Sequence, residues 1–299
     1  MSAHLPLGLI PDALGNNPVT SGSEPPLLGL IPDMPAYAYH SAIAMSASGL
    51  KRMAQSPAHF YGLQLDPNRP AAADPTPAMR NGTLVHTVLF EPDAVAARYV
   101  VRPEGMSFVT KEGRAWKEAN TDREIVDTGQ MRAALAQAQA VRALPDVAAL
   151  LQEGQPETSA FWLDAETGEL CKCRPDWTSP AGGGVILVDG KTTQDASPAG
   201  FGRAIWNFDY HLQAAWYSDG YERATGLKVH GFVFAVVESA WPHAAAAYML
   251  DDDVLDKARA QYRVLLDRYA ECKRLGVWPG YPAEIQPITL PAWALKEIT

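Results

Sequence analysis

Three residues near the middle of the chain have the types and the spacing of a metal-dependent hydrolytic site. Asp189 and Lys191 follow the apolar run Val185–Val188, and side chains two residues apart on a strand point to the same face. Asp176 ends the preceding predicted strand, 13 residues earlier, and a glycine-rich turn separates the two. Because neighbouring strands lie roughly 5 Å apart, we expect both carboxylates at one edge of a sheet.

Two ionised carboxylates that lie so close repel each other unless a cation neutralises them. Together with the backbone carbonyl of Gly190 and water, they form the oxygen ligand set that suits Mg²⁺, for which Mn²⁺ can substitute. Lys191 is placed to orient or deprotonate an attacking water. The pattern predicts metal-dependent cleavage of a phosphodiester, although Asp176 alone is equally consistent with a turn cap.

Other residues fit the same chemistry, but less specifically. Gln213 and Tyr217 are four apart on a predicted helix and so share a face, where they would brace the site. His86, on a helix face with small neighbours, is a candidate metal ligand; taken alone, a half-buried structural histidine is the better interpretation. Basic residues of predicted helices are candidate phosphate contacts, with solvated surface an equal alternative: Lys51, Arg52 and Arg80.

The elements that must position these residues alternate between helices and strands. Apolar periodicity, capping residues and Pro or Gly stops predict helices over 46–56, 77–91, 122–151, 207–226 and 251–276. Alternating or short apolar runs predict a hairpin over 158–176 and strands over 185–193, 230–239 and 244–250. The order predicts an α/β fold, with a mixed central β-sheet flanked by helices and with helical additions.

Composition separates an N-terminal arm from the rest of the chain. Residues 1–40 contain no Lys or Arg, are rich in Pro, and carry the hexapeptide LGLIPD twice, at Leu7–Asp12 and Leu28–Asp33. We therefore expect a flexible arm over residues 1–40, with either a repeated docking element or a chance duplication, and one catalytic domain over 41–299. The formal net charge of −9 argues against a surface coated in basic residues, but a basic channel and bound cations would still allow a DNA substrate.

Cysteine usage and the termini limit the class of protein further. The three cysteines are too few for a four-cysteine iron–sulfur cluster and suggest no disulfide framework. The sequence has no apolar run of membrane-spanning length and no signal-peptide pattern, so a cytoplasmic protein is expected.

The ordered set of these motifs resembles the PD-(D/E)xK nuclease superfamily, in particular its RecB-like branch with a helix histidine and a Gln-x-x-x-Tyr motif. The stretches that carry the resemblance are GTLVHTVLFEPD, CRPDW, VDGKTT and YHLQAAWY. From about Ser46 to the C-terminus the chain is most similar to the RecE (exonuclease VIII) C-terminal nuclease domain. The resemblance implies a restriction-endonuclease-like core, with catalytic Asp176, Asp189, Lys191, Gln213 and Tyr217, and with metal ligands at the first two of these, His86 and Gly190.

The same resemblance implies an activity and partners. It implies a Mg²⁺-dependent exonuclease that degrades linear double-stranded DNA from 5′ ends, assembles as a ring-shaped tetramer, and works with a RecT-like annealing protein in recombination. One position departs from the family: Gly190 stands where related sequences often carry a bulkier aliphatic residue, so looser packing and lower activity are expected. A catalytically weak protein that binds DNA ends, and a structure-specific endonuclease, are therefore kept as alternatives.

Overall fold

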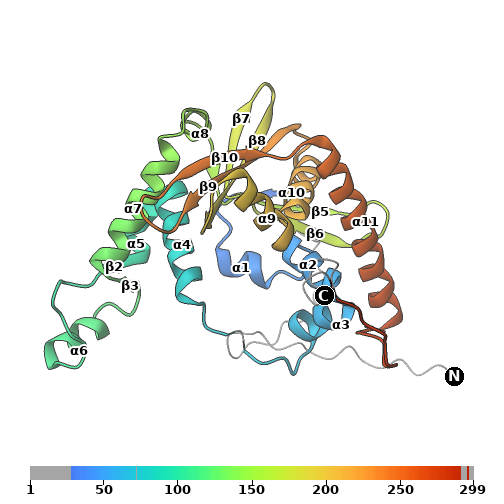
Figure 1. The fold of residues 1–299 in the computed structure, drawn as a ribbon, viewed down its shortest axis with the longest axis horizontal. Coiled ribbons are helices and arrows are strands. Elements are labelled where there is room, and N and C mark those ends of the chain that lie inside the picture. The colour runs from blue at the N-terminus through green and yellow to red at the C-terminus, as the bar shows by residue number, and fades with distance from the viewer. Residues whose placement is uncertain (1–27, 72, 291–294, 296–299) are drawn as a thin grey trace.

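The computed structural model describes residues 28–71, 73–290 and 295 (Figure 1). Its strands are, in chain order, β1 (Gly29–Ile31), β2 (Tyr99–Val101), β3 (Glu124–Val126), β4 (Gln155–Pro156), β5 (Ser159–Leu163), β6 (Leu170–Cys173), β7 (Trp177–Ala181), β8 (Gly184–Thr193), β9 (Val229–Glu238) and β10 (Ala245–Met249). Its helices are α1 (Ala36–Ser41), α2 (Ala47–Gln55), α3 (Pro57–Phe60), α4 (Pro77–Phe90), α5 (Val95–Arg98), α6 (Lys111–Glu118), α7 (Thr128–Arg142), α8 (Pro145–Leu150), α9 (Pro198–Asn207), α10 (Tyr210–Thr225) and α11 (Asp252–Leu275). A π-helical turn (Tyr61–Leu65) follows α3, and a 3₁₀ turn (Pro92–Ala94) precedes α5.

The largest sheet has the strand order β10-β9-β8-β7-β4 and is mixed. β8 and β9 run parallel, and the other neighbours are antiparallel. A parallel pair needs a long crossover connection, which α9 and α10 supply. β8 and β9 are rich in Val, Ile and Phe, and most of their residues are buried, as expected for strands covered on both faces.

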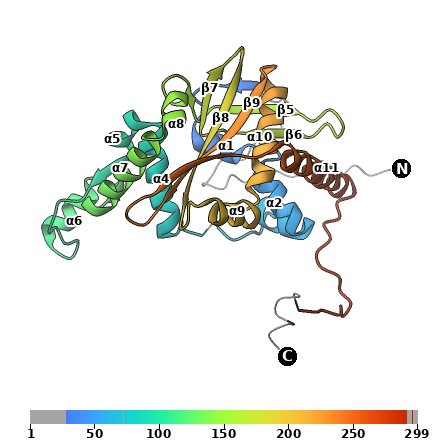
Figure 2. The same ribbon diagram turned by 45° about the horizontal axis from the view of Figure 1, so that its top comes forward.

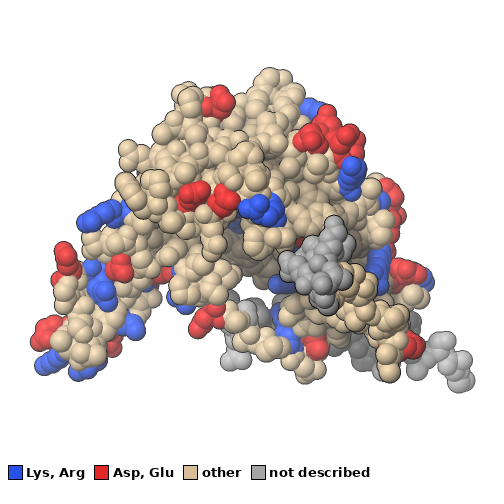
Figure 3. Space-filling view, viewed as in Figure 1, with Lys and Arg blue, Asp and Glu red and all other residues tan. Residues whose placement is uncertain are grey.

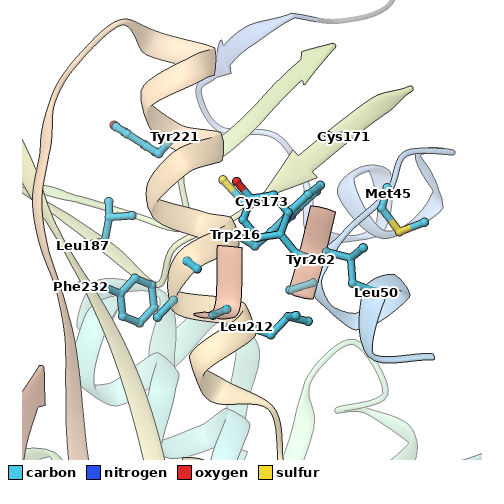
Figure 4. Packing of buried hydrophobic residues seen from close by; sticks show 14 of the residues in the cluster. Met45, Leu50, Cys171, Cys173, Leu187, Leu212, Trp216, Tyr221, Phe232 and Tyr262 are labelled. Atoms are coloured by element: carbon cyan, nitrogen blue, oxygen red, sulfur yellow. The ribbon is translucent and has the colours of Figure 1, made fainter. Parts of the chain in front are cut away.

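Each face of this sheet packs against helices. On one face, Trp216 of α10 meets Tyr262 of α11 and Leu50 of α2 in the larger hydrophobic core (Figure 4). On the other face, α4 and α7 pack through residues such as Leu84 and Val141. Neighbouring strand residues point alternately into the two cores, so the sheet is the middle layer of three (Figure 2).

The described residues together have the outline of an arch. Figure 1 shows the sheet at its top, α4 to α7 on one side, and α2, α3 and α11 on the other. The space-filling view shows the molecule hollowed between these two sides, on the side of the sheet where α1 lies (Figure 3). The candidate site described below faces this hollow through residues of α1, α4 and β8.

The second copy of the LGLIPD repeat is folded against the body. Its residues Gly29–Ile31 form β1, which pairs antiparallel with β5 in a separate sheet of order β1-β5-β6. In α1, Tyr39 is buried, and its carbonyl oxygen accepts a hydrogen bond of 2.6 Å from Lys172. The prediction of a flexible arm over residues 1–40 therefore does not hold for residues 29–40, which are folded. Within them, Gly29–Ile31 pair with the otherwise open edge of β5. The first copy, Leu7–Asp12, lies outside the described residues.

Asp176 was predicted to end a strand, but in the structure it directly precedes one. The hairpin of β5 and β6 stops at Cys173, and a further strand, β7, begins at Trp177. Sequence analysis missed β7 because the stretch WTSPAGGG consists largely of turn-forming residue types. The segment 122–151 was likewise predicted as entirely helical, yet it begins with β3, which pairs parallel with β2.

The remaining predicted elements are present, and the predicted fold class is confirmed. The side chain of Ser46 caps α2 by accepting from the amide of Gly49 at 3.2 Å, and that of Asp251 caps α11 by accepting from Val254 at 2.9 Å. The chain is a mixed α/β fold with sheets flanked by helices. Within the described residues, no helix is both long and apolar enough to cross a membrane.

Candidate active site

The β7–β8 hairpin brings Asp176 and Asp189 to the same edge of the sheet. Trp177 lies opposite Val188 in the antiparallel register, so the residues just beyond this pair are neighbours. The amide of Gly190 donates a hydrogen bond of 2.7 Å to Oδ2 of Asp176, which fixes that carboxylate beside β8. The expected convergence thus arises from an antiparallel hairpin, with Asp176 at its beginning rather than at the end of β6.

Asp189 is the most deeply buried acid of the site, with 1% of its surface exposed. Its Oδ2 pairs with the ammonium group of Lys191, and its Oδ1 accepts a hydrogen bond of 2.6 Å from Gln213 of α10. Burial raises the pKa of Asp189 to about 6, the charge of Asp176 acts in the same direction, and Lys191 opposes both. The two acids therefore repel each other at the position where a cation would relieve the repulsion.

His86 reaches the site from α4 and pairs with Asp176 through Nε2. Burial by itself lowers the pKa of the imidazole, but the charge and hydrogen bond of Asp176 outweigh it and raise the pKa to about 9. Burial likewise raises the pKa of Asp176, and His86 reverses this shift so that the net direction is downward. Without a cation, these two residues form a partly buried ion pair.

The site also contains Glu157 and Arg174, which sequence analysis missed. Glu157 follows the short strand β4, and its Oε1 lies 3.5 Å from Nδ1 of His86. Its Oε2 accepts a hydrogen bond of 2.6 Å from Nε of Arg174, which also donates to the carbonyl of Met34 at 3.0 Å. No spacing rule indicates Glu157, because it lies far from the motifs in sequence and reaches them only through the pairing of β4 with β7.

Tyr217 is not brought to the acidic groups in the way that Gln213 is. Gln213 lines the cleft, whereas the ring of Tyr217 packs edge-on against Phe232 in the larger core, with 6.1 Å between the ring centroids. Burial raises the pKa of Tyr217 well above its usual value, so its hydroxyl stays protonated. Its position is that of a packing residue behind the site.

The three candidate phosphate contacts differ in position. Lys51 donates to the carbonyl of Phe208 at 2.6 Å and lies 5.2 Å from the ring centroid of Tyr210, which Lys191 approaches to 4.7 Å. Burial lowers the pKa of Lys51 to about 8, and the charge of Lys191 adds to this effect. Tyr210 thus separates two cations, an arrangement that sequence analysis missed.

None of the three candidates lines the cleft, and Arg52 and Arg80 are also not held near Lys191 as Lys51 is. Arg52 belongs to α2, and burial lowers its pKa. Arg80 is exposed near the start of α4, where its Nε donates to the carbonyl of Pro75 at 3.2 Å. The structure therefore brings Lys51 close to Lys191 but leaves the other two candidates on α2 and α4 away from the acids.

The space beside the Cα atom of Gly190 is filled by the ring of Phe90. A Cβ atom at this position would lie 2.8 Å from Cε2 of Phe90 and 3.5 Å from Cδ2 of His86. The loss of packing expected at Gly190 is thus corrected, because Phe90 of α4 fills the space that an aliphatic side chain would take. The glycine also allows α4, with His86, to approach β8 closely.

The residues present fit a hard divalent cation such as Mg²⁺ or Mn²⁺. His86, Glu157 and Asp176 each offer a ligand atom, and these atoms lie within 4.8 Å of one another. Asp189 lies outside this group of three, and its oxygens pair with Lys191 and Gln213. The amide and carbonyl of one strand residue point to the same edge, so the carbonyl of Gly190 is directed toward the edge where its amide meets Asp176. Carboxylate and carbonyl oxygens with an imidazole match the preference of these ions.

A cleft of about 900 Å³ opens above these residues. Its walls come from distant parts of the chain: the loop before α1, helix α4, the end of β4, the edge of β8 and the start of α10. Acidic groups outnumber basic ones in its lining, which contains Asp33, Glu91, Glu157, Asp176 and Asp189 against Arg98, Arg174 and Lys191. A polyanionic substrate would therefore need the charge of bound cations to enter.

Comparison with known proteins supports the fold. The crystal structure of a provisionally assigned exonuclease from Eubacterium rectale is 16% identical and has a TM-score of 0.56, over 84% of this chain and 92% of that chain. The crystal structure of SSO0001 is 14% identical over 62% of this chain and 87% of that chain, but its TM-score of 0.27 is too low to indicate a shared fold. No curated protein matches the chain.

At this level of identity, the likeness to the Eubacterium rectale protein shows a shared fold and nothing more. A family match is more direct, because it covers residues 46–290, including every candidate catalytic residue. The chain therefore belongs to the family described as PDDEXK-like domain of unknown function (DUF3799).

Proposed function

We propose that the protein is a Mg²⁺-dependent exodeoxyribonuclease that degrades linear double-stranded DNA, 5′ to 3′, for recombination by single-strand annealing. The observation that carries the proposal is the meeting of Asp176, Asp189, Lys191 and His86 at one sheet edge, in a chain that belongs to a PDDEXK-like family. Two neighbouring carboxylates shielded from solvent repel each other, and a bound cation would offset this repulsion.

Each residue has a distinct task in this proposal. Asp176, Asp189, His86 and the carbonyl of Gly190 would hold the cation, which supplies a water of lowered pKa and offsets charge on the phosphate. Lys191, fixed by Asp189, holds the attacking water in line and offsets the growing negative charge. Gln213 keeps Asp189 in place through its hydrogen bond of 2.6 Å. Lys51 and Arg80 contact the DNA backbone away from the scissile bond.

The finer parts of the proposal rest on the resemblance to the RecE nuclease domain. They are a homotetrameric ring that encloses the duplex, a RecT-like annealing protein as partner, and processive digestion from DNA ends. The provisional assignment of the Eubacterium rectale protein as an exonuclease supports action at ends. Native mass spectrometry of the full chain, alone and with linear duplex, tests the ring: four copies are expected, and a strict monomer would exclude it.

The proposed activity is tested with end-labelled linear duplex and the same sequence as a covalently closed circle, in Mg²⁺ and in Mn²⁺. The wild type is expected to release nucleotides from the linear form and spare the circle. Lys191→Ala and Asp189→Asn should each lower the rate about 100-fold or more. Lys273→Ala is the control, since Lys273 pairs with Glu169 at the surface, at 2.6 Å. Intact linear duplex in both metals would refute the proposal, and a cut circle would indicate an endonuclease.

A further inference from the structure

A second cavity, of about 670 Å³, adjoins the candidate active site. Gly82 and Val85 of α4, Thr192 of β8 and Tyr210 of α10 line both spaces. The volume lies within the range of small-ligand sites in proteins. A substrate held at the carboxylates therefore has a neighbouring space that one of its groups can enter.

The lining of this second cavity differs in chemistry from that of the catalytic cleft. None of the described residues that line it carries a charge. Its polar groups are side-chain amides and hydroxyls in equal number, which offer both donors and acceptors, and the rest of its wall is aliphatic or aromatic. The amides are Asn81, Gln130, Gln137 and Gln194, of which Gln130 donates to Asn81 at 3.1 Å. A phosphate or carboxylate would find no cation here, whereas a neutral group with polar edges and apolar faces would be matched.

Gln137 of α7 is a polar group that lacks a full set of partners. Only 6% of its surface is exposed, and its Nε2 donates to the carbonyl of Ala133 in the preceding turn at 3.3 Å. Among the described residues, none donates a hydrogen bond to its Oε1, while the side chain lines the cavity. The Oε1 atom of this largely buried side chain therefore has an acceptor position open to the cavity, which a ligand with a donor group can use.

The two spaces meet at Gly82 of α4 and Thr192 of β8, which line both. A Cβ atom at Gly82 would lie 3.5 Å from Oγ1 of Thr192, so a long side chain there would fill the passage. Phe208, which is 58% exposed, lines the second cavity beside Tyr210, with 5.6 Å between their ring centroids. The exposed ring of Phe208, in the second cavity, offers a face on which a flat heterocycle stacks.

We propose that this second cavity binds the nucleobase of the nucleotide next to the scissile phosphate, a proposal that rests on the proposed nuclease function. A nucleobase is flat and uncharged, with donors and acceptors at its edge, and the lining offers amides for the edge and apolar groups for the faces. Amides serve as donor or acceptor by rotating, so the cavity accepts different bases. The phosphate stays with the charged residues of the cleft, and the base passes Gly82.

A photo-crosslinking experiment tests the proposal. A linear duplex carrying 5-iododeoxyuridine at its 5′-terminal nucleotide is bound to the full-length protein in Ca²⁺, irradiated and analysed by peptide mass spectrometry. Cross-links are expected in the peptides that contain Phe208, Tyr210 or Gln137. Gly82→Leu should lower their yield about tenfold, because a base that cannot pass residue 82 loses its stacking contact in the cavity. Gln137→Leu should lower it about 3- to 10-fold, the size of one lost hydrogen bond.

Two variants at exposed positions outside the cavity lining serve as matched controls. Gln139→Leu changes an exposed glutamine of the same helix, and Gly202→Leu changes an exposed helical glycine with nothing within 4 Å of its Cβ position. Both should leave the cross-link yield unchanged, and thermal unfolding confirms that all variants fold. Cross-links only at other sites, or yields unaffected by Gly82→Leu and Gln137→Leu, would overturn the proposal. Cross-links in a protein that cuts no DNA would sink the nuclease function alone.

Discussion

At the candidate site, each buried charge has a partner of opposite sign or a hydrogen-bond donor. Asp189 lies between Lys191 and Gln213, and Asp176 lies between His86 and the amide of Gly190. Partners of this kind hold the carboxylates in place before any cation binds, which lowers the cost of ordering them during the reaction. The site is therefore built in advance, and a cation would take over part of the role that His86 and Lys191 have now.

A substitution of Glu157 tests whether the neighbours of His86 contribute to metal binding by this histidine. Its carboxylate faces Nδ1 of His86, and such partners orient metal-ligating histidines. Glu157→Gln should weaken Mn²⁺ binding about 10- to 100-fold, as measured by isothermal titration calorimetry. Glu166→Gln is the control, because Glu166 is an exposed turn residue. Equal Mn²⁺ affinity in Glu157→Gln and wild type would show that Glu157 does not position the histidine.

The raised pKa of His86 predicts a dependence of stability on pH. Asp176, Glu157 and Asp189 face the imidazole and, against the effect of burial, raise its pKa to about 9, so the folded protein binds this proton more tightly than the unfolded chain does. In EDTA, the free energy of unfolding should fall as the pH rises from about 6.5 through 9. Urea denaturation of wild type and His86→Gln isolates this contribution. Parallel pH profiles for the two proteins would contradict it.

At the scale of elements, the site depends on how closely α4 approaches β8. Phe90 and His86 lie one helical turn apart on α4, and both meet the place where Gly190 has no side chain. The helix thereby delivers the imidazole to Asp176 while its aromatic neighbour closes the space behind the strand. Gly190, where the resemblance implies a bulkier residue, thus has a packing partner in Phe90.

This pairing predicts the outcome of a double substitution. Gly190→Val should destabilise the protein by about 1–3 kcal/mol, because its Cβ would collide with the ring of Phe90. Adding Phe90→Ala to Gly190→Val should restore part of that loss, although Phe90→Ala alone leaves a cavity. A urea-denaturation cycle of the four proteins measures the coupling. Additive effects within error would show that the two residues do not share this space.

Sequence analysis could predict the elements whose signals are local, and it failed where tertiary pairing decided. Apolar runs bounded by caps or glycines mark helices α4, α10 and α11 and the strand β8, which carries Asp189. Sequence analysis predicted each of these elements. β7 has turn-type residues and is a strand because β8 pairs with it. Glu157 has no motif at all, since only the pairing of β4 with β7 brings it to His86.

At the scale of the whole molecule, the charge is unfavourable for a DNA-binding protein. The chain has a formal net charge of −9, and acidic groups prevail in the cleft lining. The cleft therefore attracts a polyanion only weakly, until cations neutralise the carboxylates that line it. Binding of DNA and of the divalent cation should thus be coupled.

This coupling predicts how DNA affinity responds to Ca²⁺, which fits the ligand set but is not expected to support cleavage. Fluorescence anisotropy with a labelled linear duplex should show at least about tenfold weaker binding in EDTA than in Ca²⁺. In Asp189→Asn, which lowers the negative charge of the site, the difference should shrink. An affinity that is the same with and without Ca²⁺ would contradict the coupling.

The central claim is that Asp176 and Asp189 hold one hard cation between them. A crystal of the protein grown with Mn²⁺, measured for anomalous scattering near the manganese absorption edge, tests it most directly. We predict one strong anomalous peak that contacts a carboxylate oxygen of each aspartate and the carbonyl of Gly190. A map with no peak at this sheet edge, in crystals that bind Mn²⁺ elsewhere, would contradict the account.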